Sequence, residues 1–114
     1  MLTERDRDIL PKIIRYCERI ESKMVGLTRQ TLETDLDKKE IICFNLLQIG
    51  ELAKNMSPDF LRDYKDVPWK KVKGMRDCVA HGYGTIDLNV VWTTISKDIK
   101  PLHLYCERIL QENK

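Results

Sequence analysis

The chain has 114 residues, the length of one domain with a single hydrophobic core, and its net charge of +2 is too small to indicate nucleic-acid binding by itself. No apolar run approaches the roughly 18 residues of a membrane span, and the segment 1–6 is too charged for a signal peptide. We therefore expect one domain over residues 1–114, located in the cytoplasm.

The N-terminal half contains two long segments with helical periodicity. Thr3 is a candidate N-cap for a helix over about 4–24, and Gly26 ends that helix. Thr28 then caps a short segment, 29–35, which precedes a second long helix over about 37–56. This second helix is apolar nearly all the way round between positions 41 and 49, so we expect it to be buried on most sides.

Four residues depart from the apolar pattern of this second helix. Gly50 costs about 1 kcal/mol of helix propensity relative to alanine, which indicates close packing against a neighbouring backbone. Asn45, Gln48 and Glu51 are polar; they lie on an exposed edge, satisfy one another, or have a functional role.

The C-terminal half has a start signal for each of its helices. Ser57 and Pro58 start a short helix, and Pro68 starts the next, which ends at Gly82 or Gly84.

Asp87 is the expected cap of the last helix, whose apolar residues step by fours and threes, and Pro101 should kink it near 97–100. Together these segments predict an all-α, up-and-down bundle of four main helices with additional short helices.

The four cysteines are widely spread and lack metal-ligand spacing, so we expect reduced core thiols, no zinc site and no cofactor. His103 has no partner motif and is interpreted as a structural or surface residue. Lys70, Lys71 and Lys73 form a basic run, which is either a solvated helix face or an RNA-binding surface.

The side chains best suited to chemistry follow that run, in the pattern R-x4-H-x-Y formed by Arg76, His81 and Tyr83. Arginine stabilises charge on a phosphate, and histidine exchanges protons near neutral pH. These groups can cleave RNA by acid/base chemistry, with the 2′-hydroxyl as the nucleophile; the alternative is a hydrogen-bonded packing feature.

On an ideal helix, Asp77 and His81 share a face, whereas Arg76 and His81 diverge by about 140°. The two catalytic candidates converge on one phosphate if the arginine side chain bends round, or if a second subunit supplies some of the groups. This geometry favours a homodimer with its site at the interface.

The motif R-x4-H-x-Y, together with Val67-Pro68-Trp69, the segment LLQIGE at 46–51 and Val91-Trp92, resembles the HepT-like branch of the HEPN domain family over essentially the whole chain. The resemblance implies a helical bundle that dimerises, metal-independent endoribonuclease activity, and service as the toxin of a toxin–antitoxin pair. It also implies an antitoxin of the MNT nucleotidyltransferase type, which attaches AMP to the motif tyrosine.

Carried over by position, Arg76 and His81 are the catalytic pair, Asp77 supports them and Tyr83 is the modification target. Asp77 departs from the asparagine that is common in the family, and Gly84-Thr85 replace a bulky apolar residue. A negative charge at Asp77 would slow catalysis or raise the pKa of His81.

Two other functions compete with the ribonuclease toxin. One is a non-catalytic helical module that binds a nucleotidyltransferase, with the motif as its recognition surface. The other is a structural dimer without a ligand.

Overall fold

The computed structural model describes residues 2–78 and 87–114, and within these ranges all the regular structure is helical, which confirms the all-α prediction. The elements are α1 (Glu4–Lys23), α2 (Arg29–Thr34), α3 (Leu36–Lys54), α4 (Pro58–Asp63), α5 (Trp69–Lys73), the 3₁₀ helix η1 (Gly74–Cys78), α6 (Leu88–Lys97) and α7 (Ile99–Glu112). None of the described helices combines the length and hydropathy needed to cross a bilayer.

Side-chain caps start the helices at the positions that the sequence predicted. The hydroxyl of Thr3 accepts a hydrogen bond from the backbone N–H of Asp6 at 3.0 Å, and Ser57 does the same for Phe60 at 3.1 Å. Asp87 accepts from the first turn of α6. These bonds satisfy backbone donors that a helix start otherwise leaves unpaired, so each element begins at a defined residue.

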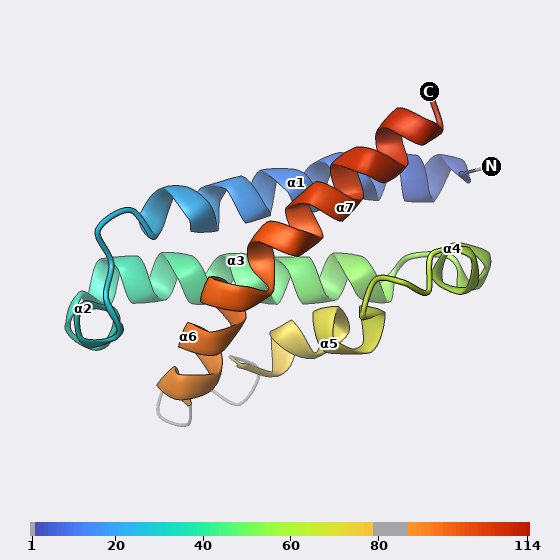
Figure 1. The fold of residues 1–114 in the computed structure, drawn as a ribbon. Helices are drawn as coiled ribbons and strands as arrows, with labels where there is room; N and C mark the ends of the chain where they lie inside the picture. Colours follow the sequence, from blue (N-terminus) through green and yellow to red (C-terminus); the bar gives the residue numbers. More distant parts are fainter. Residues whose placement is uncertain (1, 79–86) are drawn as a thin grey trace.

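The long helices α1 and α3 run side by side in opposite directions, and α7 packs across α1 (Figure 1). Their inward stripes form a continuous core, in which the side chains of Leu10, Ile13, Leu46, Ile49 and Ile109 have no exposed surface. This burial is the main favourable contribution to the fold, because each such side chain gains roughly 1.5–3 kcal/mol on leaving water.

The contact between α1 and α7 includes two small thiols and a charged cluster. Cys17 and Cys106 are free and fully buried, and burial raises the pKa of Cys106 to about 12, so both act as small apolar residues. His103 is also buried; its Nδ1 lies 2.7 Å from Glu21 Oε1 and its Nε2 lies 2.7 Å from Glu107 Oε1. His103 is therefore a structural residue, one of the two roles expected for it.

A buried carboxylate joins α1 to the start of α4. Asp6 is 1% exposed and accepts hydrogen bonds from Ser57 through the backbone N–H, at 2.9 Å, and the hydroxyl, at 2.6 Å. Burial opposes ionisation of Asp6, but the two hydrogen bonds from Ser57, a hydrogen bond with the Thr3 side chain and the charge of Arg5 together lower its pKa below the ordinary value. The pair ties the chain between α3 and α5 to the bundle.

The last helical segment is interrupted where Pro101 was predicted to kink it. The backbone N–H is missing at Pro101, so Lys97 loses its i+4 donor, and the chain turns at Asp98 between α6 and α7. The position is confirmed, and the distortion is a break between two helices.

The helix α3 is less buried than its composition predicted. Ile41 is 37% exposed and Phe44 is 50% exposed, whereas Asn45, a candidate edge residue, is only 2% exposed. The Nδ2 of Asn45 donates to the carbonyl of Ile41 at 2.6 Å, whereas its Oδ1 is buried without a hydrogen-bond partner. Two large apolar side chains therefore face outward on α3.

The helix expected from Pro68 to Gly82 or Gly84 does not continue as an α-helix. It tightens into the 3₁₀ helix η1 after Lys73. At this point η1 packs on α3 so closely that a Cβ atom on Gly50 would lie 2.6 Å from the backbone nitrogen of Arg76 and 2.9 Å from its Cβ. The predicted close approach at Gly50 is confirmed, and the neighbouring backbone is that of Arg76.

We expect Gly50→Ala to lower the free energy of unfolding by about 1–2 kcal/mol in urea unfolding experiments. The steric cost, toward the upper end of the roughly 1–3 kcal/mol typical of overpacking, exceeds the gain of about 1 kcal/mol in helix propensity. Gly74→Ala is the matched control, because its φ is −67° and no atom lies within 4 Å of the added carbon. Equal stability of the two variants would contradict the close contact.

Candidate functional site

Arg76 projects from η1 and pairs with α3. Its Nε lies 3.0 Å from Oε1 of Glu51, and the two side chains are 36% and 42% exposed. The Nε atom itself is buried and has no hydrogen-bond partner, so the contact with Glu51 is electrostatic, with the carboxylate off the N–H axis. Arg76 thus presents a partly exposed guanidinium whose Nε end contacts Glu51.

Of the other predicted site residues on this segment, Asp77 belongs to the described part of the chain. Asp77 follows Arg76 on η1 and is exposed. His81 and Tyr83 lie outside the described residues, so their catalytic and modification roles stay predictions. The ideal-helix angles between these residues do not apply, because Arg76 and Asp77 belong to a 3₁₀ turn, which has 3.0 residues per turn.

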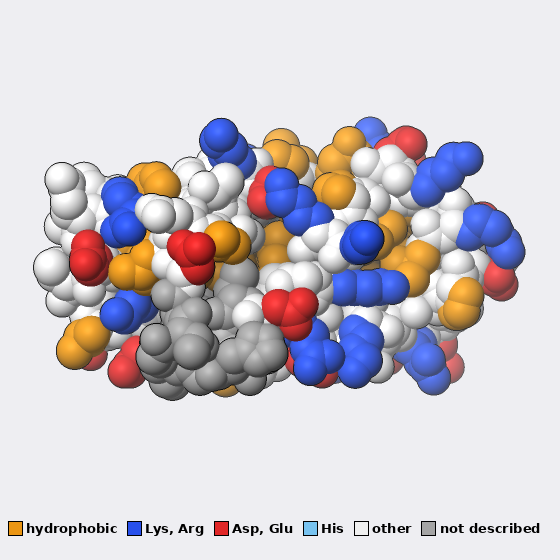
Figure 2. All heavy atoms as spheres, turned by 90° about the horizontal axis from the view of Figure 1, so that it is seen from below, with side chains coloured by type: hydrophobic (Ala, Val, Ile, Leu, Met, Phe, Trp, Pro, Cys, Tyr) orange, Lys and Arg blue, Asp and Glu red, His pale blue; other side chains and the backbone are white. Residues whose placement is uncertain are grey.

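The three lysines predicted to bind RNA differ in their surroundings. Lys70 is exposed and Lys73 is half-buried, whereas the Nζ of Lys71 pairs with Oδ1 of Asp98 at 3.2 Å. Figure 2 shows Lys and Arg side chains gathered on one face beside the segment that is not described. Lys71 is therefore already partly neutralised, and Lys70 is the more available cation of the run.

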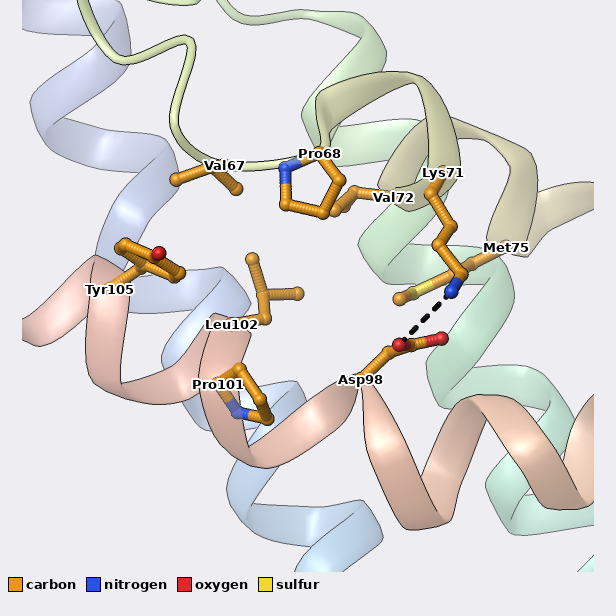
Figure 3. Close-up of a pocket in the computed structure, with 9 residues that line it drawn as sticks. All are labelled: Val67, Pro68, Lys71, Val72, Met75, Asp98, Pro101, Leu102 and Tyr105. Atoms are coloured by element: carbon orange, nitrogen blue, oxygen red, sulfur yellow. Dashed lines mark ion pairs between the residues drawn. The ribbon is translucent and has the colours of Figure 1, made fainter.

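Figure 3 shows a small cavity whose lining does not include Arg76. It lies between α5 and η1 on one side and α7 on the other, has a volume of about 50 Å³, and is mostly apolar. It is lined by Val67, Pro68, Lys71, Val72, Met75, Asp98, Pro101, Leu102 and Tyr105. This volume is far below the 300–1,000 Å³ of typical small-molecule sites, so this cavity is too small for a substrate of nucleotide size.

Metal ligands do not gather in the described ranges, where no group of three or more His, Cys, Asp and Glu side chains is placed to hold an ion.

Sequence reasoning placed Arg76 in the site but left Glu51 without a role. The two residues are 25 positions apart, and no local pattern links them. Glu51 could have been identified from its position directly after Gly50, because the glycine marks the point where another backbone approaches α3.

A family model described as Ribonuclease HepT-like matches residues 13–109. A protein of Caldanaerobacter subterraneus subsp. tengcongensis named "Putative RNase" is 32% identical over 95% of this chain and 96% of its own length. A "Probable ribonuclease HepT" of Thermococcus cleftensis is 35% identical over 84% of this chain and 87% of its own length. No solved structure gives a significant match.

Proposed function

Because this chain belongs to the HepT-like ribonuclease family, we propose that it is a metal-independent endoribonuclease that acts as the toxin of a toxin–antitoxin pair. The match to the HepT-like family model and the relative named as a ribonuclease confirm the family and the enzyme class that were predicted from the sequence. The observation that carries the mechanism is Arg76, whose partly exposed guanidinium lies on η1 next to the basic run of α5.

In the proposed reaction the RNA supplies its own nucleophile. The 2′-hydroxyl oxygen attacks the adjacent phosphorus, the bond to the 5′ oxygen of the next nucleotide breaks, and the products carry a cyclic phosphate and a 5′-hydroxyl. His81 accepts the proton from the 2′-hydroxyl or donates one to the leaving oxygen. Arg76 stabilises the charge that builds on the phosphate, and Lys70 and Lys73 attract the RNA backbone, with a smaller contribution from Lys71.

Purified protein should cleave RNA equally well with and without a chelator. Arg76→Ala and His81→Ala should each slow cleavage by about 100-fold or more, because each removes one part of the acid/base and charge-stabilising pair. The measurement is the rate of product formation on a labelled RNA, resolved by gel electrophoresis.

The competing function is a non-catalytic module that binds a nucleotidyltransferase. Intact RNA in the presence of the wild-type protein would favour that module, as would cleavage that is unchanged in both variants. Arg15→Ala, an exposed cation of α1, is the matched control for loss of one positive charge and should cleave like the wild type.

We further propose that the chain acts as a homodimer that joins two copies along α3. One face of that helix carries Ile41, Phe44, Gln48 and Glu51, at spacings of three and four residues. The exposed apolar side chains therefore lie on the same face as the carboxylate that pairs with Arg76. Exposed large side chains on one face are typical of an interaction surface. A second copy on this face would bring two motifs close together.

Phe44→Asp should shift the protein from dimer toward monomer, since it places a charge in the centre of the proposed interface. Leu104→Asp is the control, because Leu104 is 55% exposed on α7, away from this face. Sedimentation velocity at micromolar concentration measures the oligomeric state of both variants. A wild-type monomer, or dissociation caused by Leu104→Asp alone, would contradict an interface on α3.

The proposed partner is an MNT-type nucleotidyltransferase antitoxin, with Tyr83 as its target. Each added AMP is a bulky anion close in sequence to Arg76 and Lys73, where it would occupy the RNA-binding surface and repel the phosphate backbone. Asp77 adds a negative charge beside the same surface, so we expect it to slow cleavage.

Co-expression with a small nucleotidyltransferase should add the mass of one or more AMP groups to Tyr83. Peptide mass spectrometry locates the modification, and Tyr83→Phe should abolish it. Adducts on Tyr105, a half-buried tyrosine of α7, or no adducts at all, would contradict the assignment.

A further inference from the structure

Two consecutive residues of α3, Gly50 and Glu51, both act on Arg76. The absence of a side chain at Gly50 lets the backbone of Arg76 approach to a distance that a Cβ atom would prevent. The carboxylate of Glu51 then meets the guanidinium of that same arginine. One residue thus determines where the arginine backbone lies, and the next acts on its side chain.

The contact uses only one edge of the guanidinium. Glu51 faces Nε, which is buried, whereas about a third of the whole side chain remains exposed. Among the residues that the structure describes, no second carboxylate pairs with Arg76. Arginine binds phosphate through paired N–H groups, and the two terminal amines form such a pair.

Charge sets a limit on this arrangement, because a carboxylate also repels a phosphate. Glu51 meets the guanidinium at Nε, so a phosphate bound at its far end lies farther from the carboxylate than the positive charge does, and the attraction outweighs the repulsion. The attraction between Glu51 and Nε acts over only 3.0 Å and restricts the rotamers of a long side chain.

We propose that Glu51 is the positioning residue for Arg76 in RNA cleavage. It holds the guanidinium at Nε so that the terminal amines face the scissile phosphate. This role rests on the proposed ribonuclease function, since it requires that Arg76 contact the substrate. Positioning of this kind raises the rate of the chemical step, because the stabilising charge no longer has to be ordered during the reaction.

The test is Glu51→Gln, which keeps the shape of the side chain and removes its charge. We expect kcat for RNA cleavage to fall by about 10- to 100-fold with little change in KM or in urea stability, since a half-exposed ion pair contributes little to folding. Glu51→Asp should recover part of the rate. Glu40→Gln, on an exposed position of the same helix, is the matched control and should cleave like the wild type.

Two further measurements separate positioning from a structural role. Combined with Arg76→Ala, Glu51→Gln should cause no additional loss, because both substitutions remove one interaction. The NMR order parameter of the Arg76 Nε–H group should fall in Glu51→Gln but not in Glu40→Gln.

Specific outcomes would overturn the proposal. Wild-type rates in Glu51→Gln would exclude positioning, and a faster rate would show that Glu51 masks the arginine. Additive losses in the double variant would also exclude it. Intact RNA with the wild-type protein would overturn the ribonuclease function itself and the positioning role with it.

Discussion

The close contact between Gly50 and the backbone of Arg76 is the constraint on which the candidate site depends. Glycine weakens an exposed helix by about 1 kcal/mol, yet here it allows η1 to pack directly on α3. That packing buries Val72 and Met75 and brings Arg76 within reach of Glu51. A larger side chain at position 50 would separate the two elements, and the ion pair would lose its geometry.

The helices and their starts could be predicted from the sequence because caps and proline act locally. Thr3, Ser57 and Asp87 each satisfy donors within three residues, so no knowledge of the fold is needed to recognise them. The change to a 3₁₀ helix after Lys73 could not be predicted in the same way. Apolar side chains three residues apart, such as Val72 and Met75, share a face in both kinds of helix.

Which face of a helix meets which neighbour was harder to predict. The run of apolar residues in α3 indicated burial on most sides without showing which side is exposed, and in the structure Phe44 is half exposed and Asn45 is buried. Composition does not reveal where the other helices lie. The pairing of Glu51 with Arg76 depends on the same tertiary arrangement, which explains why the arginine was identified from its motif and the glutamate was not. His81 and Tyr83 stay predictions, because they lie outside the described residues.

The break at Asp98 has a mechanical consequence for the bundle. In a single long helix, backbone hydrogen bonds would connect the residues after the motif directly to those packed on α1. Here the ladder is interrupted at Asp98, so α6 and α7 are two helices with separate axes. The direction in which α6 leaves the motif segment is therefore set by the turn at Asp98 and by its ion pair with Lys71, and the buried thiols Cys17 and Cys106 lie on the α7 side of that turn.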